Sequence, residues 1–155
     1  MKIRVRRFDP GSDPQPRWEA FDIPGVDVES VLGVLQRIRE SSDSTLAFRY
    51  GCRFKGCGLC TVGIDGRPLP ACMIRAGEGM EVAPLGCLPV LRDLVIDRRP
   101  LVERFARWGL FLRPPEGEEH PASFEVPEAY ASLADCTECL ACMAGCPSFD
   151  LHEES

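Results

Sequence analysis

Residues 51–60 read Gly-Cys-Arg-Phe-Lys-Gly-Cys-Gly-Leu-Cys, and a further cysteine follows at Cys72. The first three cysteines, Cys52, Cys57 and Cys60, have the C-x4-C-x2-C spacing of plant-type [2Fe–2S] ligand loops. Two irons and two bridging sulfides need four thiolates, and a short loop can bring three of them around one cluster. The stretch therefore predicts a [2Fe–2S] site made by Cys52, Cys57, Cys60 and Cys72.

Zinc binding and a purely structural role are the alternatives for these thiols. Zinc loops usually present CxxC pairs, and here only Cys57 and Cys60 form such a pair. The glycines favour the cluster, because N–H groups that point at sulfur often need a φ above zero, which a Cβ resists. We expect Gly51, Gly56 and Gly58 to stand at such positions.

The residues after Cys60 predict a hairpin that carries the fourth ligand. Residues 61–64 predict a strand, Asp65-Gly66 a tight turn, and residues 68–72 the returning strand. Cys72 is then expected on a rigid strand rather than on a mobile loop.

Composition and cysteine usage indicate a reducing environment. The chain has 155 residues, 45% of them hydrophobic, which is enough for one ordinary domain or two small ones. Residues 1–8 are rich in Lys and Arg and lack the apolar core of a signal peptide, so the nine cysteines favour metal binding in the cytoplasm over disulfides. No run of 18 apolar residues is present, so we expect no membrane span of its own.

Charge and motifs exclude several classes of function. The net charge is −6, and residues 101–155 hold 3 Lys and Arg against 11 Asp and Glu, which argues against nucleic-acid binding. No dinucleotide fingerprint, P-loop or nucleophile–base pair is present. We therefore expect a chain that performs no bond chemistry itself.

The order of the elements predicts an α+β fold. Strand, strand, helix and then strands around a metal loop are typical of a β-grasp domain like that of plant-type ferredoxins, which we assign to residues 1–99. The expected elements are a hairpin of strands 2–8 and 17–23, a helix over 28–40 capped by Asp27, a short strand over 46–50, and a last strand over 80–83.

A second cysteine run lies near the end of the sequence. Cys136, Cys139, Cys142 and Cys146, followed by Pro147, have the spacing of bacterial ferredoxins, with zinc as the alternative. Three of these cysteines wind around one [4Fe–4S] cube, and the fourth ligates the other cluster in two-cluster ferredoxins. Residues 100–155 are thus expected to form a small helical domain built on half of a two-cluster ferredoxin. Its expected elements are a helix over 101–110, an irregular strap over 113–127 and a short helix over 128–135.

Together these features resemble the iron–sulfur subunit of succinate dehydrogenases and fumarate reductases. That family has the same short gap before the fourth cysteine and the same order of the two cysteine runs. Cys87 departs from the family, which usually has a small residue without a thiol there; we interpret it as a small buried side chain, with a ligand role as the alternative. Further matching segments are Phe48-Arg49, Pro84-Leu85, Leu88-Pro89-Val90 and Arg92-Asp93-Leu94.

The resemblance also implies that the C-terminal part is truncated. In the family a downstream cysteine run closes the [4Fe–4S] cube, whereas here nine residues follow Cys146. Cys136, Cys139 and Cys142 then need a fourth ligand, which Cys146, a partner chain, or a non-protein or neighbouring group would supply. A relic without a cluster is the remaining alternative, and we favour completion within the chain or by a partner.

The resemblance implies an electron-transfer subunit. It would relay single electrons between a flavoprotein that acts on a small organic acid such as succinate or fumarate and a further acceptor or donor. A free-standing ferredoxin and a zinc scaffold are the alternatives. The expected location is the cytoplasm, with attachment to the inner face of a membrane through partners as an option. Because Arg49, Arg53 and Lys55 surround the ligand loop, we expect a potential above the approximately −400 mV of plant-type ferredoxins.

Overall fold

The computed structural model describes residues 1–24, 29–109, 128 and 135–149. The described residues fall into two compact units. The first comprises Met1–Asp97 together with the residues from Thr137 onward, and the second extends from Arg98 to Cys136. The proposed domain boundary at residue 99 stays a prediction.

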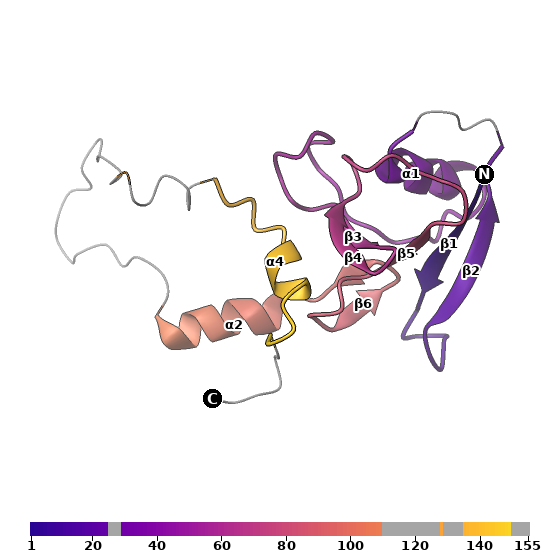
Figure 1. Cartoon of the computed structure of the whole chain (residues 1–155). Coiled ribbons are helices and arrows are strands. Elements are labelled where there is room, and N and C mark those ends of the chain that lie inside the picture. Colours follow the sequence, from indigo (N-terminus) through magenta and orange to yellow (C-terminus); the bar gives the residue numbers. More distant parts are fainter. Residues whose placement is uncertain (25–28, 110–127, 129–134, 150–155) are drawn as a thin grey trace. The chain divides into compact units, whose positions relative to one another are not determined.

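The first unit is built on a five-stranded sheet with the order β2-β1-β5-β3-β4 (Figure 1). β1 pairs antiparallel with β2 and parallel with β5, and β3 pairs antiparallel with β4 and β5. The prediction of a fold that combines helices with a sheet is confirmed. The strands are β1 (Lys2–Arg7), β2 (Arg17–Asp22), β3 (Thr61–Ile64), β4 (Arg67–Pro70) and β5 (Glu81–Ala83).

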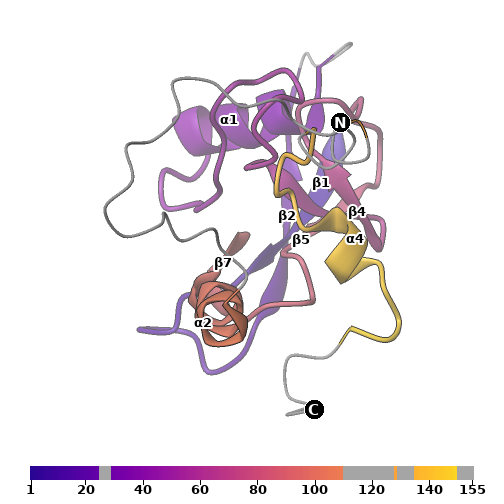
Figure 2. The same cartoon turned by 90° about the vertical axis from the view of Figure 1, so that its left-hand side faces the viewer.

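One hydrophobic core joins the sheet to helix α1 (Val31–Ser41), which can be followed in Figure 2. On β1, Ile3 and Val5 alternate with exposed residues, as expected for a strand with one buried face. The helix contributes residues at helical spacing. Its buried side chains are Val31, Leu32, Val34, Leu35 and Ile38.

Helix α1 begins later than predicted, so the expected start at Val28 is wrong. Ser30 caps the helix, and its side-chain oxygen accepts a hydrogen bond from the Gly33 N–H at 3.2 Å. Glu29 and Ser30 are not helical because they pair with the segment after Cys72: the Glu29 carbonyl accepts the Ala76 N–H, and Ser30 forms a β-bridge with Arg75. The predicted cap, Asp27, lies outside the described residues.

The predicted strand over 46–50 is also wrong. Ala47 donates its N–H to the Asp93 carboxylate at 2.8 Å and accepts the Leu94 N–H at 3.1 Å, which is too short a pattern for a ladder. Asp93 occupies the turn of a small hairpin that the sequence did not predict, formed by β6 (Val90–Arg92) and β7 (Val95–Ile96). Residues 46–50, which lead into the cysteine loop, are therefore held mainly by the Asp93 side chain rather than by strand pairing.

Two helices follow in the described part of the chain. α2 (Arg99–Trp108) confirms the predicted helix near 101–110, and it ends at Gly109 in the left-handed conformation. α4 (Ala141–Ala144) is a single turn within the second cysteine run. The predicted strap over 113–127 and most of the predicted helix over 128–135 lie outside the described residues. Among the described helices, none has the length and apolar character that a membrane span requires.

Candidate metal centre

The structure brings Cys52, Cys57, Cys60 and Cys72 together, and backbone N–H groups of the loop point at their sulfur atoms. The Gly56 N–H donates to Cys52 Sγ at 3.1 Å, and the Lys55 N–H donates to Cys72 Sγ at 3.3 Å. The N–H groups of Cys52 and Phe54 donate to Cys57 Sγ at 3.4 Å and to Cys52 Sγ at 3.5 Å. Such donors stabilise thiolates, and they tune the potential of bound clusters.

Two charged residues, rather than glycines, adopt most of the positive φ angles in the loop. Arg53 and Lys55 both have φ +66°, and the peptides that follow them carry the N–H groups that point at Cys52. The expectation of positive φ holds for Gly58, at +64°, but is wrong for Gly51 and Gly56.

At Gly51 a glycine is needed because a side chain would have little space, not because of the backbone conformation. An added Cβ there would lie 3.2 Å from Leu59 Cδ1 and 3.3 Å from Cys57 Sγ. A side chain at this position would therefore press on a ligand sulfur.

The local environment separates the thiols by acidity. Hydrogen bonds from the backbone N–H groups of Cys52 and Leu59 lower the pKa of the Cys57 thiol. Burial raises the pKa of Cys60 to about 11, and the neighbouring Cys72 sulfur adds to that shift. A buried thiol of this kind becomes a thiolate when a metal cation supplies the compensating charge.

Cys72 lies in a turn, which corrects the prediction that it is carried by a strand. β4 ends at Pro70, whose carbonyl accepts the Met73 N–H at 2.9 Å. The Ala71 N–H donates to the Cys60 carbonyl at 3.1 Å. The hairpin therefore still ties the fourth cysteine to the third, through the residue before Cys72.

The four thiols are neighbours, but they are not arranged around one common metal position. Within residues 1–24, 29–109, 128 and 135–149, no group of three or more His, Cys, Asp or Glu side chains is placed to hold one metal ion. The side chains of Cys52 and Cys57 interact with each other, and so do those of Cys60 and Cys72, while Cys57 also acts electrostatically on Cys60. Two thiol pairs suit a cluster with two irons better than a zinc ion, which needs its four ligands around one centre.

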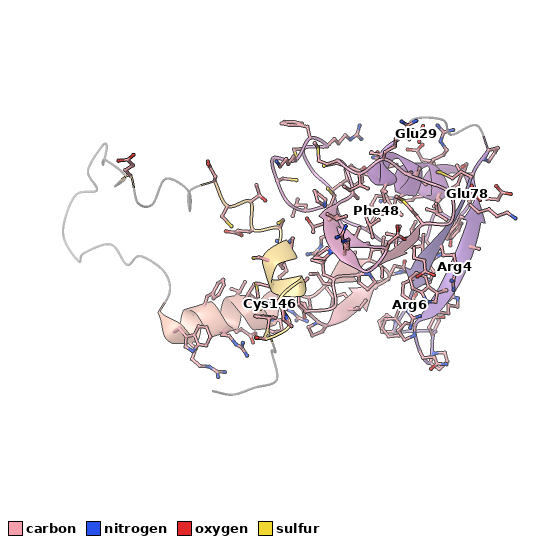
Figure 3. All side chains as sticks on the ribbon, in the orientation of Figure 1. Arg4, Arg6, Glu29, Phe48, Glu78 and Cys146 are labelled. Carbon is pink, nitrogen blue, oxygen red and sulfur yellow. The ribbon has the colours of Figure 1, made fainter. Side chains whose placement is uncertain are left out.

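In the second run, Cys139, Cys142 and Cys146 belong to one short segment around α4. Figure 3 labels Cys146 in this segment. Cys139 is half-buried between Glu138 and Leu140, which have φ values of +51° and +64°. Cys142 and Cys146 are exposed, as is Cys136, which belongs to the other unit. Soft thiolates on a strongly turned backbone suit an iron–sulfur ligand set.

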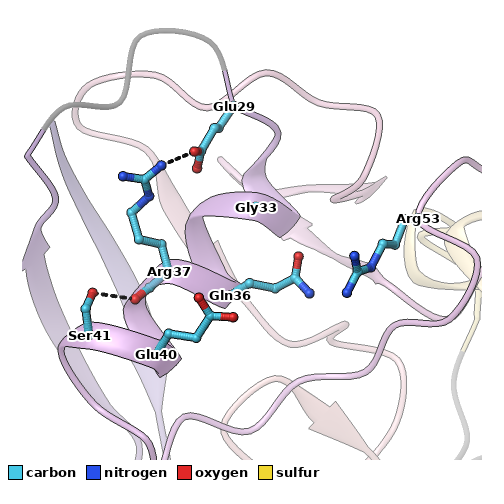
Figure 4. Close-up of a pocket in the computed structure, with 7 residues that line it drawn as sticks. All are labelled: Glu29, Gly33, Gln36, Arg37, Glu40, Ser41 and Arg53. Carbon is cyan, nitrogen blue, oxygen red and sulfur yellow. Dashed lines mark hydrogen bonds and ion pairs between the residues drawn. The ribbon is translucent and has the colours of Figure 1, made fainter.

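Tyr50 is a neighbour of the site that the sequence analysis missed. The Arg53 guanidinium lies 5.5 Å from the centroid of its ring, and hydrogen bonds from Gln36 and Arg53 lower the pKa of its phenol. Figure 4 shows Arg53 and Gln36 pointing toward one another. They line an open, polar cavity of about 480 Å³, which presents no cysteine. Its other lining residues are Glu29, Gly33, Arg37, Glu40 and Ser41.

The loop also exposes apolar side chains beside the thiols. Phe54 is 74% exposed, and Leu59 and Met73 are exposed as well. Contiguous patches of exposed apolar side chains often mark surfaces that contact another protein.

Comparisons with known proteins agree with this geometry. A family model described as "2Fe-2S iron-sulfur cluster binding domain" matches residues 2–103. A fumarate reductase (CoM/CoB) subunit of Methanothermobacter marburgensis is 34% identical over 95% of this chain and 30% of its own length. The fumarate reductase iron–sulfur subunit of Haemophilus influenzae is 28% identical over 99% of this chain and 67% of its own.

A solved structure is also similar. A chain of the Mycobacterium smegmatis Sdh1 complex in the apo form superposes with a TM-score of 0.79 and is 31% identical. The alignment covers 99% of this chain and 66% of that one. The chain thus spans only part of each of these proteins, from 30% to 67% of their lengths.

Proposed function

Because the chain belongs to the 2Fe-2S iron–sulfur cluster binding domain family, we propose that Cys52, Cys57, Cys60 and Cys72 hold a [2Fe–2S] cluster. The observation that carries this proposal is the set of backbone N–H groups aimed at the sulfurs of two adjacent thiol pairs. Such a cluster takes up and gives away one electron at a time. The chain contributes the thiolates, the N–H donors and the positive charge of Arg53 and Lys55.

The finer description of the fold is part of the same proposal. Residues 1–99 form a β-grasp domain, for which the order β2-β1-β5-β3-β4 and the helix between β2 and β3 are the support. Residues 100–155 form the helical half of a two-cluster ferredoxin domain, supported by the cysteine spacing and by α4 within it.

The second run holds a [4Fe–4S] cluster in this account. Cys136, Cys139 and Cys142 supply three ligands, and Cys146 or a partner's residue supplies the fourth. The support is the ferredoxin spacing and the exposed or half-buried state of all four thiols, which leaves them accessible to a cluster.

The proposed function is that of an electron-relay subunit without bond chemistry of its own. Several relatives are named fumarate reductase iron–sulfur subunits, and we extend that role to this chain. Its partner would be a flavoprotein that oxidises or reduces a succinate-like or fumarate-like acid, docked over the apolar side chains of Phe54, Leu59 and Met73. Where Cys146 is not the fourth ligand, a further subunit would complete the second cluster. These partners would place the chain at the cytoplasmic face of a membrane.

Cysteine variants test the ligand assignment. Replacing Cys52, Cys57, Cys60 or Cys72 by serine should abolish or strongly alter the S = 1/2 EPR signal of the reduced protein, whereas Cys87→Ser should leave it unchanged. A signal that survives in Cys60→Ser and disappears in Cys87→Ser would refute the ligand set.

Isolation of the native protein tests the partner. The chain should co-elute with a flavin-containing subunit, and addition of that subunit's acid substrate should reduce the cluster. Elution as a monomer carrying its clusters would instead support the free-standing ferredoxin.

A further inference from the structure

Gly58 is buried although much of the loop around it is open to solvent. Its neighbours Gly56 and Leu59 are exposed, and Gly58 is covered by the segment that begins the second cysteine run. An added Cβ at Gly58 would lie 2.5 Å from the Thr137 carbonyl oxygen and 2.8 Å from Cys139 Cβ. Real Cβ atoms do not approach other atoms so closely, so only glycine allows this contact.

A second contact lies on the adjoining hairpin. An added Cβ at Gly145 would lie 3.5 Å from Pro68 Cγ, which belongs to β4. Leu140, between the two contact points, is buried. The second run therefore rests on the hairpin that links Cys60 to Cys72 as well as on Gly58.

We propose that Gly58 allows the second cysteine run to pack directly against the first site, so that the Cys139 backbone contacts the loop between Cys57 and Cys60. This inference rests on the proposed function, because the contact would set the gap that an electron crosses. With clusters bound at both sites, a single electron would pass from one to the other across this gap, without any bond forming or breaking. The contact leaves no room for a side chain between Gly58 and Cys139.

The chain offers a control that separates packing from backbone strain. Gly58 and Gly66 have φ values of +64° and +76°, so alanine strains the backbone at both positions. An added Cβ at Gly66 meets nothing within 4 Å, whereas at Gly58 it meets the second run. Only Gly58→Ala should therefore displace residues 137–145.

The test is hydrogen exchange by mass spectrometry on the anaerobic full-length chain. In Gly58→Ala, amides from Cys139 to Gly145 should exchange at least about tenfold faster than in the wild type, which corresponds to about 1.4 kcal/mol. In Gly66→Ala they should be unchanged. Equal exchange of this segment in all three proteins would overturn the proposal.

A second variant keeps the test valid if Gly58→Ala fails to fold or loses its cluster. Pro68→Ala acts from the other side, since it removes the ring carbon that lies 3.5 Å from the position of an added Cβ at Gly145, while residue 58 and the second run stay unchanged. Hydrogen exchange of the amides from Cys139 to Gly145 should become faster, and the [2Fe–2S] EPR signal should stay unchanged. Exchange as slow as in the wild type would contradict the proposed packing. A wild type without a [2Fe–2S] signal would defeat the proposed function, but exchange would still report the contact.

Discussion

Asp93 shows how one buried carboxylate organises the approach to the cysteine loop. It is 1% exposed, and its Oδ1 accepts hydrogen bonds from Arg7 Nε and the Phe8 N–H, both at 2.9 Å. Its other oxygen accepts the Ala47 N–H at 2.8 Å. The end of β1, the β6–β7 turn and the segment before Cys52 are thereby fixed to one side chain.

Replacing this carboxylate by an amide should destabilise the fold. In Asp93→Asn the Arg7 cation, which is 5% exposed, loses its most buried counter-charge. The free energy of unfolding should fall by about 3 kcal/mol, because a buried charge is left without this partner. We expect the thermal midpoint of the anaerobic chain, followed by circular dichroism, to fall by at least about 6 °C. The control is Asp22→Asn, an exposed carboxylate 3.7 Å from the N-terminal amine, which should change little. Equal shifts in the two variants would contradict this role.

Asp43, a second partner of Arg7, makes stability depend on pH in acid. A hydrogen bond from the Thr45 hydroxyl, followed by one from Arg7, lowers the pKa of Asp43 to about 2. The carboxylate is depressed in the folded state, so its stabilisation is complete above its ordinary pKa near 4 and is lost as the pH falls toward 2.

The measurement compares wild type with Asp43→Asn. The wild type should be more stable by about 1 kcal/mol at pH 6, and the difference should shrink below pH 4 in thermal unfolding of the reduced, cluster-free chain. A difference that grows on acidification would show that the sign is wrong.

Lys55 separates backbone conformation from charge in the cysteine loop. Its φ of +66° is tolerated by glycine and strongly resisted by a β-branched residue. Lys55→Gly should therefore keep full iron content, while Lys55→Val should bind less iron, as judged by iron analysis and EPR spin integration. Both variants lose one positive charge, so the cluster potential should fall in each by on the order of 30 mV. Comparable iron content in the two variants would argue against backbone strain.

At the scale of elements, local sequence patterns predicted the strands and turns that are stabilised locally. Alternation of polar and apolar residues identified β1. Asp65-Gly66 identified the β3–β4 hairpin, because the turn residues favour that geometry by themselves. The cysteine spacing identified four thiols that the fold does bring together.

The elements that were mispredicted depend on distant partners. The start of α1 is set by the pairing of Glu29 and Ser30 with Arg75 and Ala76, more than 40 positions away in the sequence. The segment near Ala47 is held by the Asp93 side chain, which no periodicity reveals. Positive φ at Arg53 and Lys55 likewise follows from the N–H groups that must point at sulfur, and residue type alone suggested the glycines instead.

At the scale of the whole molecule, the fourth ligand of the proposed [4Fe–4S] cluster is either Cys146 or a residue of a partner. Cys146 is exposed, and its N–H donates to the Met143 carbonyl at 3.2 Å, so it sits just after the helix that carries Cys142. If a partner completes the cube, Cys146→Ser should keep the [4Fe–4S] Mössbauer spectrum in the purified complex. Loss of the spectrum with or without the partner would make Cys146 the fourth ligand, with Cys87→Ser as the matched thiol control.

The first site should not need the second run in order to bind its cluster. Its four cysteines and the N–H donors described above lie within residues 51–72, and the core that supports them lies within residues 1–94. A chain ending after Arg99 should therefore fold and keep the site, although Gly58 would lose its cover.

EPR of that shortened chain after dithionite reduction tests the central claim most directly. The account predicts a rhombic S = 1/2 signal that integrates to about one spin per chain, as one reduced [2Fe–2S] cluster gives. Circular dichroism should show that the shortened chain is folded. A folded, iron-reconstituted protein with no such signal would contradict the assignment of Cys52, Cys57, Cys60 and Cys72.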